Sequence, residues 1–494
     1  MKNKLLLALA LLCAYFVGCG DYDESVDNPL YGSAEKEAVI DMARYTVIIY
    51  GISGGDMDSI IEGAYEQMKP LMKNKDVRVY VTYKYGTDSS AVGYDEDENP
   101  IKIPFTGKYA EPGQLVAFEL TKDLDLNSIK NNARMAGESL MMSDPGMISS
   151  VLDHVADSLP AKDYVFVFWG HGEGFDFDVD FPKEWRAAPA AVAKLQNVSN
   201  IPQASAAILY DEWTLDLETA FQEGLNMYEF MQEVENSKIK HFKGLYFHNC
   251  HMGNFEALSE VYTVADYMIA SEHKLASDGT LISNLVKELY KKDNFQDAVE
   301  ASLDDSEKYW KKTYKEEEKN GDLSLLKSSE ISSFFPIFKN IAKRLKTLYK
   351  VPEQKEIIDY AVVHSYFVGG EEWYYSGEFN SDAFFFVSFV AQQTGDDSLI
   401  AYAKELKQAF DRLVIKKIEA HYNEEYGINS FSQSILLTPN AFYNGETMWD
   451  YTRKDAYENT TFHKKTGWGD FLKVLTGIDE FFDDGDENNS EDEE

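Results

Sequence analysis

The sequence predicts an α/β fold in which a largely parallel sheet is flanked by helices, followed by a mixed, mainly helical C-terminal domain. An apolar run at Ala43–Gly51, a helical pattern from Ile60 to Leu71 and a strand-like run at Val77–Lys84 give the order of a parallel crossover. Two further runs, within Tyr164–Gly174 and Gly244–Glu256, have the continuous apolar character of strands buried on both faces. The crevice of such a sheet lies beyond the carboxyl ends of its strands, so residues that end these runs are the first candidates for a site.

Local patterns predict the elements between these runs. A β-rich insertion is expected over Tyr94–Leu120, and apolar residues at helical spacing predict a helix over Gly146–Leu159. Further helices are expected over Leu225–Val234 and Glu256–Ala265. The second of these would begin just after Cys250, where its N-terminal dipole would favour a thiolate.

From about Leu281 the pattern changes to amphipathic helices, such as Pro336–Leu348. Two later segments, Phe384–Ala391 and Ser434–Leu437, are expected to be extended. The predicted organisation is a signal peptide over 1–18, a polar leader over 19–42, an α/β domain over 43–285, a mixed helical domain over 286–478 and an acidic, disordered tail over 479–494.

The N-terminus has the layout of a lipoprotein signal. Two lysines precede an apolar segment, Leu5–Val17, that is too short to span a bilayer. Gly18 and Cys19 then resemble a lipobox, in which the cysteine is lipidated and begins the mature chain. Acidic residues directly after Cys19 resemble an export signal of surface lipoproteins, so we expect a lipid anchor at the outer membrane or cell surface. Ordinary secretion with cleavage nearby is the alternative.

The charge of the chain argues against nucleic acid as a partner. Its 494 residues carry a net charge of -38, and the tail from Asp479 to Glu494 holds ten acids and no base. A phosphate backbone would be repelled by such a field, whereas cationic substrates would be attracted.

Cysteine usage and one histidine suggest nucleophilic catalysis. If Cys13 leaves with the signal and Cys19 carries lipid, Cys250 is the one thiol that remains, and a free thiol in an exported chain is a candidate nucleophile. His171 ends the other buried strand and could act as base and then as acid. The N–H groups of Gly172 and Cys250 could stabilise an oxyanion. The alternatives are an inert buried cysteine and a histidine of the core or a turn.

The cluster of His248, Cys250 and His251 raises the question of a metal site. In a strand, His248 and Cys250 share a face while His251 points elsewhere, and the sequence has no second ligand pair at zinc spacing. We therefore expect no metal and no cofactor.

Two short motifs carry a resemblance to a known family. They are WGHG at Trp169–Gly172 and NCHMGNFE at Asn249–Glu256. Supporting matches follow the same order along the chain: YTVIIYG from Tyr45, MSDPG from Met142, ADYMIASE from Ala265 and TGWGDFL from Thr466. With these residues the chain resembles the clostripain family of cysteine peptidases, which share the caspase-like α/β fold.

The resemblance implies peptide-bond hydrolysis through a thioester, with His171 as general base, Cys250 as nucleophile and Gly172 as an oxyanion donor. It also implies cleavage after Arg or Lys, self-cleavage in the loop between the catalytic strands, and calcium as the one cofactor to consider. The loop offers basic residues for such cuts, namely Lys183, Arg186 and Lys194. No EF-hand-like loop is visible in the sequence.

One position departs from the family pattern. The aspartate that precedes the catalytic cysteine by two residues, and helps to hold a basic P1 side chain, is His248 in this sequence. A histidine cannot pair with Arg or Lys as a carboxylate does. The pocket is therefore predicted to include His248 together with Asp211 and Asp278, either of which could supply the missing charge, as could Glu212.

These features predict a lipid-anchored cysteine endopeptidase at the cell surface, with peptides or proteins as substrates. The alternative is a binding or adhesion lipoprotein that keeps the peptidase-like fold without turnover. A glycan hydrolase with paired carboxylates is a third class, but no pair of acids stands out in the sequence.

Overall fold

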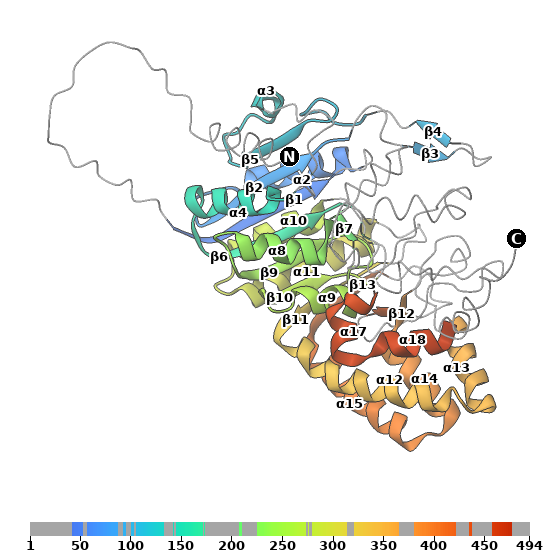
Figure 1. The fold of residues 1–494 in the computed structure, drawn as a ribbon. Coiled ribbons are helices and arrows are strands. Elements are labelled where there is room, and N and C mark those ends of the chain that lie inside the picture. Colours follow the sequence, from blue (N-terminus) through green and yellow to red (C-terminus); the bar gives the residue numbers. More distant parts are fainter. Residues whose placement is uncertain are drawn as a thin grey trace, which may run out of the picture. The chain divides into compact units, whose positions relative to one another are not determined.

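An eight-stranded mixed sheet organises the described part of the chain (Figure 1). The computed structural model describes residues 42–52, 57–86, 92–94, 100–102, 105–132, 142, 145–170, 172, 207–209, 225–272, 275, 279–313, 321–364, 380–420, 434–436 and 457–476. Across the sheet the strands are β13 (Val414–Ala420), β11 (Gly321–Lys327), β10 (Ala265–Ala270), β9 (Phe242–His248), β6 (Ala161–Trp169), β1 (Ala43–Ile52), β2 (Val77–Lys84) and β5 (Leu115–Glu119).

The five central strands, β10, β9, β6, β1 and β2, are parallel to one another. The flanking strands β5 and β11 pair antiparallel with them, and β13 pairs antiparallel with β11. This arrangement confirms the predicted largely parallel sheet of an α/β fold.

The sheet is buried on both faces because successive side chains of its central strands enter two different cores. Val47 and Ile49 of β1 lie in one core, whereas Ile48 and Tyr50 lie in the other. Apolar residues therefore occupy consecutive positions in the middle of these strands, as in Val165–Trp169 of β6, which explains their apolar runs.

Helices cover both faces. The core with Ile48 is closed by α4 (Met147–Ser158), α8 (Met227–Asn236) and α9 (Phe255–Val261), and the core with Val47 by α2 (Asp58–Met68), α10 (Thr280–Leu289) and α11 (Phe295–Thr313). The C-terminal part adds η3 (Ser328–Ser333), α12 (Phe334–Leu348), α13 (Pro352–His364), α14 (Ala383–Thr394), α15 (Asp397–Leu413), α17 (Thr461–Thr466) and α18 (Trp468–Thr476), whose apolar residues extend the first core.

Short elements complete the described chain. They are η1 (Lys69–Leu71), β3 (Val92–Tyr94), β4 (Pro100–Lys102), η2 (Leu126–Ser128), α3 (Ile129–Asn132), β7 (Ala207–Leu209), β8 (Leu225–Asn226), β12 (Asn380–Asp382) and β14 (Ser434–Leu436). No helix among the described residues combines the length and the apolar character needed to cross a bilayer.

Three sequence-based element predictions need correction. Phe384–Ala391 is not extended but lies in the helix α14. The Asp382 side chain caps this helix by accepting a hydrogen bond from the Phe385 N–H, and Gly395, in the left-handed region, ends it. A continuous apolar run has no period that separates a buried strand from a buried helix. The predicted helix over Glu256–Ala265 ends at Val261, because Ala265 already begins β10. The helix expected from Leu225 begins at Met227, after the short strand β8.

The predicted division at residue 285 stays a prediction. The structure adds that two strands of the sheet, β11 and β13, come from the C-terminal side of that boundary. The sheet therefore depends on chain from both predicted domains.

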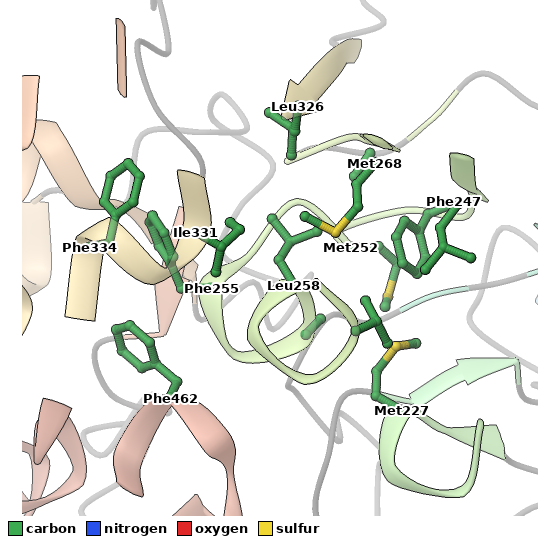
Figure 2. Close-up of a cluster of buried hydrophobic side chains, with 14 of the residues drawn as sticks. Met227, Phe247, Met252, Phe255, Leu258, Met268, Leu326, Ile331, Phe334 and Phe462 are labelled. Carbon is green, nitrogen blue, oxygen red and sulfur yellow. The ribbon is translucent and has the colours of Figure 1, made fainter. Parts of the chain in front are cut away.

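Phe255, the first residue of α9, packs against aromatic residues of the C-terminal helices, among them Phe334 and Phe462 (Figure 2). Its ring is fully buried and lies within 6 Å, centroid to centroid, of four other phenylalanine rings: Phe334, Phe338, Phe410 and Phe462. These rings come from α12, α15 and α17, so one side chain contacts three helices.

We predict that Phe255→Ala lowers the free energy of unfolding by about 3 to 5 kcal/mol, because it leaves a cavity between elements that cannot close around it. Urea denaturation of the two proteins measures the difference. Phe385→Ala is the matched control, since its ring is 53% exposed, and we expect a change of about 0.5 kcal/mol. Equal losses in both variants would contradict the assigned role of Phe255.

Candidate active site

The parallel pairing of β6 with β9 brings the two predicted site segments to one edge. Trp169, the last residue of β6, is the register partner of His248, the last residue of β9. Beyond the strands, the side-chain amide of Asn249 donates to the carbonyl oxygen of Gly170 at 2.9 Å. The turn after β6 and the turn that carries Cys250 are therefore tied directly to each other.

Gly172 lies against the backbone of Cys250. A Cβ placed on Gly172 would be 2.7 Å from the Cys250 carbonyl oxygen and 2.7 Å from Cβ of Asn249. No side chain fits at this distance, so the glycine is required by the close approach of the two turns. His171, between Gly170 and Gly172, lies outside the described residues, and both of its neighbours contact the Cys250 turn.

Cys250 is half-buried beyond the end of β9 and packs against the core that contains Tyr246 and Leu275. Its sulfur accepts a hydrogen bond from the backbone N–H of Leu275, with 3.3 Å between N and Sγ. Leu275 follows β10, the next strand of the sheet. This donor could not be predicted from the sequence, because a backbone N–H leaves no signal in residue type.

The turn after Cys250 is held by hydrogen bonds to the end of β10 on one side and to the start of α9 on the other. His251 has a left-handed backbone, with φ of 55°, and its Nδ1 lies 3.1 Å from the Glu272 carbonyl oxygen. The Gly253 N–H donates to the Ser271 carbonyl oxygen at 2.6 Å. Asn254 donates to the carbonyl oxygen of His251 at 2.7 Å and caps α9 by accepting from the Ala257 N–H at 2.8 Å.

His248 is enclosed by aromatic rings. Its ring is 2% exposed, stacks on Trp169 with 4.1 Å between centroids, and meets Tyr246 edge to face at 5.9 Å. Within the described part of the chain, neither ring nitrogen has a hydrogen-bond partner. Burial lowers the pKa of His248 to about 3, so its ring is neutral at neutral pH.

A buried charge cluster lies beside the Cys250 turn. Lys417 of β13 places its Nζ 2.8 Å from Oε2 of Glu272 and 3.5 Å from Oδ2 of Asp322 in β11. Asp322 Oδ1 accepts from the Ser271 hydroxyl at 2.8 Å and from the Glu272 N–H at 2.9 Å. Burial disfavours the lysine charge, but the two carboxylates outweigh it and hold the pKa of Lys417 above its usual value.

The structure brings together only part of the predicted site. Gly172 and Cys250 are in contact, and His248 ends the strand that leads to Cys250. Four predicted residues lie outside the described residues: His171, Asp211, Asp278 and the lipidation candidate Cys19. Among the side chains that the structure describes, no group of three or more His, Cys, Asp and Glu is placed to hold a metal ion.

Solved structures of C11 proteases resemble this chain in fold. An inactive zymogen from Parabacteroides distasonis is 15% identical, with a TM-score of 0.50 over 86% of this chain and 98% of that one. A secreted enzyme from Bacteroides thetaiotaomicron is 14% identical, with a TM-score of 0.51 over 86% of this chain and 99% of that one. A structure of a secreted C11 protease from the same species with an irreversible peptide inhibitor is 12% identical, with a TM-score of 0.51 over 87% of this chain and the whole of that one.

These similarities confirm the predicted caspase-like fold. No curated protein matches the sequence. The model of the clostripain family, by contrast, matches residues 213–474, more than half of the chain and a span that includes Cys250. The chain therefore belongs to the clostripain family and is a cysteine peptidase of the clostripain type.

Proposed function

We propose that this chain is a lipid-anchored endopeptidase in which Cys250 is the nucleophile and His171 the general base. The observation that supports the dyad is the contact of Gly172 with the Cys250 backbone, together with the hydrogen bond from Asn249 to Gly170. Both chain neighbours of His171 are thereby held against the turn that carries the thiol.

In the proposed reaction, His171 removes the proton from Cys250, and the thiolate attacks the carbonyl carbon of the scissile peptide bond. The N–H groups of Gly172 and Cys250 donate to the oxyanion that forms. The C–N bond then breaks, and the protonated His171 gives its proton to the departing amine. Water, activated by the same histidine, hydrolyses the thioester and restores the thiol.

The neutral state of His248 bears on which side chain is bound at P1. A carboxylate at this position would attract Arg or Lys, but a neutral ring stacked on Trp169 offers no charge. We propose that binding of a basic P1 side chain relies on Asp211 and Asp278. Because His248 adds nothing to that binding, we expect a weaker preference for basic residues than a carboxylate at position 248 would give.

The proposed location is the outer membrane or cell surface, with Cys19 carrying the lipid. The support comes from the sequence at residues 1–24, where a short apolar segment leads to Gly18, Cys19 and a group of acids. The substrate class is peptides and proteins, as a peptide inhibitor in a structurally similar C11 protease suggests.

Cys250→Ala should abolish hydrolysis, reducing kcat/KM by about a thousandfold or more, because the thioester of the proposed reaction forms on the Cys250 sulfur. Peptide cleavage by the full chain measures this loss. Urea denaturation of the same preparations should show an unchanged fold, since the substitution removes only a half-buried sulfur. Substantial cleavage by a folded Cys250→Ala protein would rule out Cys250 as the nucleophile.

His248→Asp should raise the preference for Arg or Lys over neutral residues at P1 by about tenfold, the effect of one charge-assisted hydrogen bond. A peptide library that varies every residue at P1 measures it. His248→Asn is the matched control, because asparagine has nearly the shape of aspartate and no charge. If both variants show the same P1 profile, His248 does not line the pocket.

The same library separates the proposed enzyme from a binding lipoprotein. Iodoacetamide-sensitive cleavage by the wild-type chain supports the peptidase. Absence of cleavage of every peptide, in a chain that is folded, would favour the binding function instead.

A further inference from the structure

We infer that the backbone N–H of Leu275 is a positioning group that holds the sulfur of Cys250 as a thiolate. The inference rests on the proposed function only in taking that thiolate to be the nucleophile. Its starting point is the hydrogen bond from the Leu275 nitrogen to Cys250 Sγ, at 3.3 Å.

The surroundings of the sulfur show why such a donor would favour the thiolate. Cys250 is half-buried and packs against an apolar core, and the Leu275 side chain, 8% exposed, belongs to the same core. Apolar surroundings disfavour the charged form of a thiol, whereas a hydrogen bond to the sulfur favours it. Leu275 therefore supplies both an apolar side chain that disfavours the thiolate and an N–H that favours it.

The chain that leads to this donor is anchored at Ser271 and Glu272. Asp322 accepts hydrogen bonds from the Ser271 hydroxyl and the Glu272 N–H, and the Glu272 carboxylate pairs with Lys417. Both carboxylates are 1% exposed, so water does not compete for these contacts. The segment also holds the other side of the nucleophile turn, because the Ser271 carbonyl oxygen accepts from the Gly253 N–H.

A second anchor follows the donor. Gly279, the residue before α10, has φ of 71°, and a Cβ on it would lie 2.8 Å from Cβ of Ala64 in α2. The left-handed backbone and the close approach both require glycine at this point. In sequence, Leu275 thus lies between two anchored points, Ser271 and Glu272 before it and Gly279 after it, and a donor that is already in place needs no reorganisation when charge develops on the sulfur.

Rates of iodoacetamide alkylation of Cys250 between pH 4 and 10 test the inference, because only the thiolate reacts. The full chain is used, and the Cys250 peptide is followed by mass spectrometry so that the other two cysteines do not contribute. The principal variant replaces Leu275 by its α-hydroxy analogue, which turns the N–H into an ester oxygen and keeps the side chain. Leu275→Ala is the matched control, since it shortens the side chain and keeps the N–H.

We expect the ester variant to raise the apparent pKa of alkylation by about 1, and Leu275→Ala to change it by less than half as much. The described titratable groups around the nucleophile turn, which are His248, His251, Glu272, Asp322 and Lys417, are the same in all three proteins, as is His171 in the sequence. At pH values below the pKa of the thiol, the ester variant should hydrolyse peptides about tenfold more slowly than the wild type, and at high pH its rate should recover. A general loss of structure would not produce this pH dependence. An unchanged pKa in the ester variant would overturn the inference.

Hydrogen exchange on unaltered backbone gives a second test should the ester variant not fold. Exchange of the Leu275 N–H should be faster in Cys250→Ala than in the wild type, because its acceptor is gone, and equal rates would count against the hydrogen bond.

The two proposals can fail separately. If alkylation responds as expected but the wild type cleaves no peptide, the thiolate is held as inferred and the proposed endopeptidase reaction of Cys250 and His171 is wrong.

Discussion

The parallel register of β6 and β9 is the constraint on which the site depends. Trp169 and His248 are register partners, so the residues that follow them begin at the same edge of the sheet. A shift by one residue would send every side chain of one strand to the opposite core. Such a shift is costly because Leu245 and Phe247 of β9 lie in one core and Tyr246 lies in the other. Burial across the sheet thereby sets the distance between Gly172 and Cys250.

The strand beyond β9 completes the turn that carries the thiol. The end of β10 contacts that turn through Ser271, Glu272 and Leu275, and the cluster of Glu272, Asp322 and Lys417 anchors this end. Asp322 and Lys417 come from β11 and β13, two strands late in the sequence. Residues late in the sequence therefore help to hold the turn that carries Cys250. Removing one member of a buried charge cluster leaves another uncompensated, so the cluster favours a single arrangement of these strands.

His248 links the architecture of the site to its specificity. Its ring stacks on Trp169 of the neighbouring strand and is neutral because it is buried. A carboxylate at the same place would have to be desolvated unless a cationic ligand paired with it. The histidine removes that cost and, in the proposed pocket, would also remove the attraction for a basic side chain. The packing of the strand ends and the proposed specificity thus involve the same residue.

The sequence by itself determined where the central strands lie and which residues end them, because unbroken apolar runs that stop at glycine and polar residues are visible without a structure. It determined His171, Gly172 and Cys250 as candidates for the same reason. The tertiary structure decided that Phe384–Ala391 is helical. The apolar run has no period of its own, so the helix is marked only by the residues that cap it, Asp382 and Gly395. The tertiary structure alone decided that β11 and β13 join the sheet, and that Leu275 donates to the sulfur. These contacts join residues far apart in the chain, and a backbone N–H is the same in every residue but proline, so no local pattern encodes them.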